Sequence, residues 1–262
     1  MKFIRLATIT ALSTTILAGG AVSAFAEEAR EVTTDGQVEF RPAGEEDGEL
    51  EVINPEPGPD VEIEPEIPGT TGPLSIVKAA TMDFGSQVIS NQDKWYNMVA
   101  EMQQLAGTEG DENKVPYVSF AQVQDLRGTN EGWDLQVSLD DFTSNTQNDT
   151  LTGANVTLIG SRVQYEGNTP ENAPTAHEDG LVLIPNEGAR SVLTAAEGQG
   201  AGASSVVWGD QADLNAQFAD ESVETVENKA IELFVPGSTS KDATTYTSTL
   251  TWELTSTPGA DA

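Results

Sequence analysis

One stretch decides the fold class that the sequence predicts: Trp133-Asp134-Leu135-Gln136-Val137-Ser138-Leu139. Its apolar residues occupy every second position, so they share one face of an extended strand and leave the other face polar. Residues 246–254 repeat this alternation around Leu250 and Trp252, with threonines between the apolar positions. Threonine suits the pleated, half-buried surface of an antiparallel sheet. Both stretches are therefore predicted to be strands with one buried face.

The chain around these two stretches consists of short apolar runs separated by clusters of Gly, Asn, Asp and Pro. Weaker strand candidates are residues 76–84, 115–123, 156–165, 181–184, 205–208 and 231–235. Many short strands with turn residues between them predict an all-β fold, an antiparallel β-sandwich of Greek-key or immunoglobulin-like topology. Only residues 94–105 have helix-like spacing. We expect at most one or two short helices, and this segment is equally a candidate for a loop across the sandwich.

The first 26 residues are predicted to be a secretory signal peptide. Lys2 and Arg5 precede an apolar stretch, and Ala24-Phe25-Ala26 forms a small-residue cleavage site before Glu27. The apolar stretch is shorter than the roughly 20 residues that span a bilayer, so we expect no membrane insertion. The sequence has no cysteine and no sorting motif near its end. Attachment to a cell would therefore be noncovalent.

Residues 27–70 are rich in Pro and Glu and are predicted to be a disordered, extended lead-in, because such a composition buries too little apolar surface to offset the entropy of ordering. Residues 37–40 alternate and are allowed one short strand. Residues 71–262 are then predicted to form a single folded domain.

The charge balance excludes several function classes. The chain carries 43 acidic and 12 basic residues, a formal net charge of −31, and nucleic-acid binding requires clustered Lys and Arg. The only histidine, His177, lies in a predicted loop and is expected to be solvated. We expect no enzymatic activity, no cofactor and no metal centre, although loop acids such as Asp140, Asp141 and Asp149 leave calcium binding open.

Two copies of a Trp-x-Leu motif carry a family resemblance: Trp133-Asp134-Leu135 and Trp252-Glu253-Leu254, the second preceded by Tyr246 and Leu250. Further matching motifs are Thr71-Gly-Pro-Leu-Ser75, Asp83-Phe-Gly85 and Val235-Pro-Gly237. With the signal peptide and the acidic lead-in, these motifs resemble the WxL domain family of low-GC Gram-positive bacteria. The resemblance covers about residues 74–258.

This resemblance implies a secreted protein of the cell wall and cell surface that attaches noncovalently by binding peptidoglycan, as a subunit of a surface complex. Implied partners are membrane-anchored WxL-interacting proteins and host matrix proteins. An alternative stays open, in which the protein is an adhesin or assembly subunit whose main ligand is a protein. The large N-terminal module of longer family members has no counterpart in this chain.

The motif residues have two interpretations, in the core or on a glycan-binding surface. They are Trp133, Leu135, Tyr246, Leu250, Trp252 and Leu254. In an alternating strand these side chains share the apolar face, where burial of an indole contributes several kcal/mol at roughly 25 cal/mol per Å2. On an exposed face, an indole would stack on a sugar ring. Trp95 or Trp208 is an alternative candidate for that role.

Overall fold

The computed structural model describes residues 35–44, 52–65 and 67–256. It divides the chain into two units, residues 1–39 and residues 40–262. In the first unit, residues 35–39 contain no strand, and Val38 is 71% exposed. The short strand predicted at residues 37–40 is therefore not formed. The predicted signal peptide lies outside the described residues.

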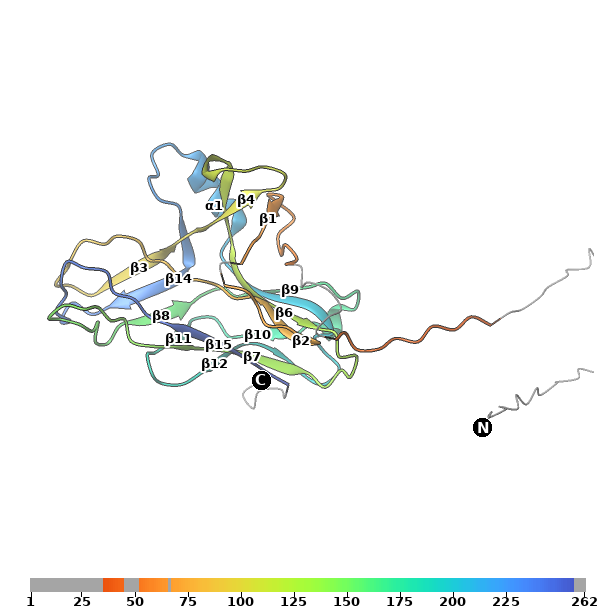
Figure 1. Ribbon diagram of the computed structural model, residues 1–262. Coiled ribbons are helices and arrows are strands. Elements are labelled where there is room, and N and C mark those ends of the chain that lie inside the picture. The colour runs from red at the N-terminus through yellow and green to blue at the C-terminus, as the bar shows by residue number, and fades with distance from the viewer. Residues whose placement is uncertain (1–34, 45–51, 66, 257–262) are drawn as a thin grey trace, which may run out of the picture. The chain divides into compact units, whose positions relative to one another are not determined.

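The strands of the second unit pair antiparallel in four small sheets, A to D (Figure 1). Sheet A has the order β1 (Val61–Glu62), β4 (Glu101–Leu105), β5 (Lys114–Tyr117). Sheet B has the order β2 (Leu74–Lys78), β6 (Ser119–Asp125), β13 (Gly202–Trp208), β9 (Arg162–Tyr165). Sheet C has the order β11 (Leu181–Leu183), β8 (Asn155–Leu158), β14 (Glu227–Val235), β3 (Lys94–Val99). Sheet D has the order β10 (Thr175–Ala176), β12 (Arg190–Ala195), β7 (Trp133–Leu139), β15 (Leu250–Thr255).

This topology corrects the predicted fold. The strands form four small sheets in a four-bladed arrangement, so the predicted antiparallel β-sandwich of Greek-key or immunoglobulin-like topology is wrong. A sandwich consists of two sheets that are each buried on one face. Sheet B is instead buried on both faces, because the neighbouring residues Phe120 and Ala121 of β6 are both inaccessible to solvent. The predicted all-β class is correct for the described residues, which include one α-helix.

Two extended segments change sheets along their length, which explains why the strands divide into four sheets. β3 of sheet C continues through Ala100 into β4 of sheet A, and β5 of sheet A continues through Val118 into β6 of sheet B. Both connecting residues are buried. The alternation of side chains predicts an extended segment, but it does not show which sheet each half of that segment joins.

The positions of the strands follow the sequence pattern more closely than the sheets do. β7 covers Trp133–Leu139, as predicted, whereas the strand predicted from residue 246 begins later, at Leu250 of β15. The helix or loop predicted at residues 94–105 is wrong, because this segment forms β3 and β4. Burial at alternate positions, including Met98 and Ala100, fits the strand.

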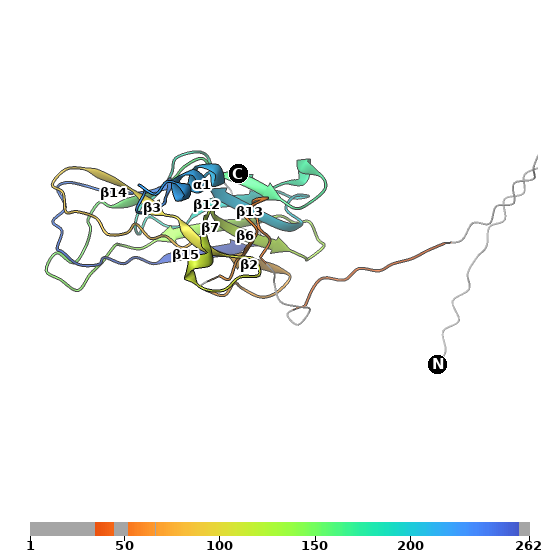
Figure 2. The same cartoon turned by 90° about the horizontal axis from the view of Figure 1, so that it is seen from above.

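Two hydrophobic cores hold the sheets together. The larger core is shared by sheets B, C and D and includes Trp133, Leu135, Val156 and Trp208. The smaller core lies between sheet A, the other face of sheet B and helix α1 (Gln211–Ala219). Figure 1 shows α1 and β4 above and the strands of sheet D below, and Figure 2 gives the view from above. Sheet B is thus the layer between the two cores.

Residues 52–65 belong to the folded unit, which corrects the predicted disorder of residues 27–70 for this part. Val61 of β1 is 4% exposed and lies in the smaller core. The buried amide of Gln122 holds Ile53 in two ways: it accepts from Ile53 N at 3.0 Å and donates to Ile53 O at 2.8 Å. Proline limits the secondary structure of this segment to the two-residue strand β1, and specific side-chain contacts order the residues before it.

Helix α1 begins after Asp210, whose carboxylate accepts from Ala212 N at 2.8 Å and from Asp213 N at 3.3 Å. This is the usual N-cap of an α-helix. Two short 3-10 helices, Asp111–Asn113 and Pro170–Asn172, lie in the connections. In the described part of the chain, no helix has the length and apolar character needed to cross a bilayer.

Candidate functional site

The two Trp-x-Leu motifs, far apart in the sequence, lie on neighbouring strands of sheet D. Pairing of β15 with β7 places Trp252 opposite Val137 and Leu254 opposite Leu135. Residues directly opposite each other in an antiparallel pair point to the same face. Both motifs therefore direct their apolar side chains towards the larger core.

Trp133 is a core residue in every respect. Its side chain is inaccessible to solvent, and its indole Nε1 donates to the carbonyl oxygen of Gly200 at 3.1 Å. Gly200 has a φ of +72°, and a Cβ at that position would lie 2.6 Å from Trp133 Nε1. The glycine-rich turn before β13 is thus shaped to close over the indole, and Leu135 beside it is equally buried. These two residues have no surface available for a glycan.

Trp252 lies at the edge of the same core and keeps part of its surface accessible. Its ring centroid is 6.3 Å from that of Trp208, with an angle of 49° between the planes. Trp208 itself is inaccessible to solvent, so its proposed alternative role as an exposed sugar-stacking residue is wrong. Leu250 and Leu254 are half-buried on the same edge strand. The second motif therefore lies at the border of the larger core.

His177 is the partner of Trp208, which corrects the expectation of a solvated loop histidine. Trp208 Nε1 donates to His177 Nε2 at 2.9 Å, and the two rings stack with centroids 6.0 Å apart. Because an indole nitrogen only donates, this imidazole is neutral and carries its proton on Nδ1, which donates to Glu178 O at 2.7 Å. Burial lowers the pKa of His177 below its ordinary value, against an opposing contribution from the Glu178 carbonyl.

Tyr246 joins two loops and is not free to bind a ligand with its hydroxyl. Its Oη donates to Asn148 O at 2.6 Å and accepts from Asp242 N at 2.9 Å. The Asp242 carboxylate accepts from Asn148 N at 2.9 Å and from Asn148 Nδ2 at 2.7 Å. These hydrogen bonds, that from the Asn148 backbone first, lower the pKa of Asp242. Tyr246 thus orders the approach to β15.

A cleft of about 930 Å3 lies beside this loop cluster and is bordered by residues 82–89 and 241–248. Its apolar floor includes Phe84 and Phe142, which are 8% and 9% exposed and meet edge to face at 6.5 Å. Lys241 on its border donates to three backbone carbonyl oxygens, at 2.9 to 3.1 Å. The Phe84 and Phe142 rings of the cleft therefore contact each other, and the Lys241 ammonium is bound by backbone carbonyl oxygens.

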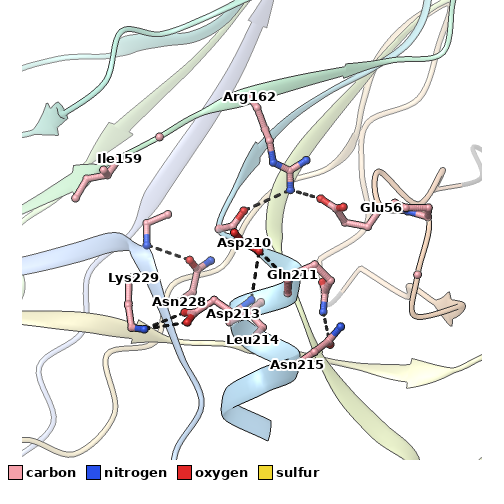
Figure 3. Close-up of a pocket in the computed structure, with 16 residues that line it drawn as sticks. Glu56, Ile159, Arg162, Asp210, Gln211, Asp213, Leu214, Asn215, Asn228 and Lys229 are labelled. Carbon is pink, nitrogen blue, oxygen red and sulfur yellow. Dashed lines mark hydrogen bonds and ion pairs between the residues drawn. The ribbon is translucent and has the colours of Figure 1, made fainter. Parts of the chain in front are cut away.

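A second pocket, of about 1000 Å3, lies at the start of α1 (Figure 3). Its cations are paired: Arg162 donates to Glu56, and Lys229 Nζ lies 2.9 Å from a carboxylate oxygen of Asp213. Asp210 is committed to the helix cap. The residues that line this pocket include no aromatic ring, no histidine and no nucleophile with an adjacent base. The Arg162–Glu56 pair ties residues 52–65 to sheet B, and the Lys229–Asp213 pair ties β14 to α1.

Among the described residues, no group of three or more His, Asp or Glu side chains lies close enough together to hold a metal ion. The acids singled out for calcium include Asp141, which accepts a hydrogen bond from Asn186 Nδ2 at 2.8 Å.

One exposed aromatic side chain lies on the outer face of sheet C. Trp95 of β3 is 60% exposed, and its ring lies 4.9 Å from that of the half-buried Phe234 of β14. Neither residue belongs to a hydrophobic core. The alternation in β3 shows the reason: Tyr96 and Met98 face the larger core, so Trp95 faces outwards.

Comparison with protein-family models identifies the class of protein. Residues 27–258 match the model described as WxL domain surface cell wall-binding. The chain belongs to this family, as its motifs indicate, and the family is a cell-wall-binding surface domain. The protein is therefore located at the cell wall surface. Comparison with curated proteins and with solved structures finds no match.

Sequence reasoning missed several features of these sites. The His177–Trp208 pair joins a loop to a strand 31 residues away, and no local sequence pattern predicts this contact. Helix α1 had a local signal, because Asp210 precedes a run without Gly or Pro that is rich in Ala and Gln. The contact between the tilted rings of Trp95 and Phe234 depends on the pairing of β3 with β14.

Proposed function

We propose that this protein attaches noncovalently to the wall by binding peptidoglycan, without catalysing a reaction. The observation that supports this most is the match of residues 27–258 to a cell-wall-binding domain. The two pockets add support, since their charged groups are already paired or held by the backbone.

Charge affects how such binding would respond to salt. A chain with a net charge of −31 is repelled by anionic wall polymers, and salt screens this repulsion over a Debye length of about 10 Å at 0.1 M. We expect the purified protein to sediment with sacculi that lack protein and teichoic acid, and we expect high salt to preserve or strengthen binding. Loss of binding in high salt would indicate an electrostatic or cation-bridged association, and absence of sedimentation would reject peptidoglycan as the ligand.

A second candidate function is that of a subunit of a surface complex, with a membrane-anchored or host matrix protein as the main ligand. The observation in its favour is the open edge of sheet D, where β15 pairs only with β7 among the described strands. An exposed edge can accept a strand from a partner. This function predicts protein capture that persists when the sacculi are omitted.

A further inference from the structure

We propose that the outer face of sheet C is the glycan-binding platform of this protein, on which Trp95 and Phe234 receive one neutral pyranose ring. This inference rests on the proposed peptidoglycan binding and adds to it the site and the class of sugar.

Strand pairing defines the platform. β14 pairs with both β3 and β8, and Phe234 stands opposite Trp95 on one side and Asn155 on the other. One step along the strands, Glu232 stands opposite Asn97 and Thr157 in the same way. Since opposite residues of an antiparallel pair share a face, these six side chains form two adjacent rows, one with two aromatic rings and one polar.

The opposite face of the same strands packs against the larger hydrophobic core. Tyr96, Leu233 and Val156 pack in or against the larger hydrophobic core. The strands of sheet C are therefore buried on one side only, and the aromatic row lies on the side that neither core covers. Trp95, which is exposed and contacts Phe234 on this side, does not contribute to either core.

The shape of the aromatic row suits a single ring. The Trp95 and Phe234 planes are tilted by 41° with centroids 4.9 Å apart, so they form a shallow corner and not a flat surface for several residues. The axial hydrogens of a pyranose ring give it an apolar face that can stack on the 60% exposed indole. Its hydroxyl groups would then project towards the neighbouring row.

The polar row has unused hydrogen-bonding capacity. The side chains of Glu232 and Thr157 in this row, and of Asn155 in the aromatic row, make no hydrogen bond or ion pair to other described residues. Asn97 Nδ2 donates to Glu227 at 2.8 Å. A carboxylate, a hydroxyl and an amide are suitable partners for sugar hydroxyl and acetamido groups.

Charge selects among the wall polymers. The six platform residues include one carboxylate and no cation, and binding of a phosphate-rich polymer needs Lys or Arg. The platform therefore fits a neutral amino sugar of a glycan strand and disfavours teichoic acid. The cleft beside residues 241–248 is a poorer candidate, because its Phe84 and Phe142 rings are buried against each other.

The test compares Trp95→Ala, Trp95→Tyr and Phe218→Ala in the full secreted chain. Phe218 is a matched control, since it is 51% exposed on helix α1. Binding is measured by sedimentation with teichoic-acid-free sacculi and by isothermal titration calorimetry with neutral N-acetylglucosamine oligomers. We expect Trp95→Ala to weaken both by about ten-fold, as for an aromatic hot spot. Trp95→Tyr should retain most of the binding, and Phe218→Ala should match the wild type.

Melting temperatures of all variants are compared to exclude unfolding. If the wild type binds sacculi and Trp95→Ala binds equally well, the platform is rejected while peptidoglycan binding stands. If the wild type binds neither sacculi nor oligomers, the proposed function and the platform both fail. Equal losses in Trp95→Ala and Phe218→Ala would also reject the platform, since they would show a general response to lost surface apolarity.

Discussion

The two Trp-x-Leu motifs have the same spacing but different environments. Trp133 and Leu135 lie on β7, which is flanked by β12 and β15, and both are inaccessible to solvent. Trp252 and Leu254 lie on β15, the edge of the same sheet, and are half-buried. Position in the sheet therefore determines how deeply each motif is buried, and the Trp-x-Leu pattern does not reveal that position.

The largest expected effect is that of Trp133→Ala. Truncation of a fully buried tryptophan leaves a cavity and costs about 3–5 kcal/mol, and this variant also leaves the Gly200 carbonyl without its indole donor. A domain is stable by only about 5–15 kcal/mol. We expect a large loss of stability in urea unfolding, together with loss of wall binding. A variant that unfolds like the wild type would show that the core assignment of Trp133 is wrong.

The turn over Trp133 offers an independent test of the same core. In Gly200→Ala the new methyl group meets the Trp133 indole at 2.6 Å and the backbone keeps a φ of +72°. The left-handed conformation costs about 1–2 kcal/mol for a residue other than glycine, and overpacking adds about 1–3 kcal/mol. A matched control is Gly198→Ala, which has positive φ but open space around its Cβ. Equal destabilisation by both changes would remove the argument for close packing over Trp133.

Trp252→Ala should cost less, about half the value for Trp133→Ala, because only part of its surface is removed from water. For a domain of this size a loss of 1 kcal/mol lowers Tm by roughly 2–4 °C. Thermal unfolding of the two variants side by side measures the difference directly. Equal losses would show that the edge position of β15 does not weaken the second motif.

Alternation of side chains was sufficient to predict the all-β class and β7 to the residue, because a period of two leaves few alternatives for Trp133–Leu139. The alternation predicted neither the number of sheets nor that residues 52–65 are ordered. Those depend on long-range contacts, such as the hydrogen bonds between Gln122 and Ile53. Trp95 was named only as an alternative sugar-stacking residue. Its exposure depends on strand β3, and the spacing of residues 94–105 resembled that of a helix.

The smallest expected effect is that of pH, and it distinguishes the two indole environments. The Trp133 indole donates to a backbone carbonyl, which does not titrate, whereas Trp208, in contact with Trp252, donates to His177. Burial lowers the pKa of His177 below 6.5 in the folded protein. The unfolded chain then binds the proton more readily in the interval between the lowered pKa and 6.5.

The contribution of His177 to the free energy of unfolding is consequently fully present above about pH 6.5, and it is lost as the pH falls through the lowered pKa. The measurement is urea unfolding of the wild type and His177→Gln between pH 7.5 and 5, above the ordinary carboxylate pKa values of about 4. Glutamine can still accept from the Trp208 indole but does not titrate, so the difference between the two proteins isolates the histidine. We expect the wild type to lose more stability than His177→Gln as the pH falls. Parallel curves would show that His177 does not couple protonation to the indole pair, and the two motifs would then differ in burial alone.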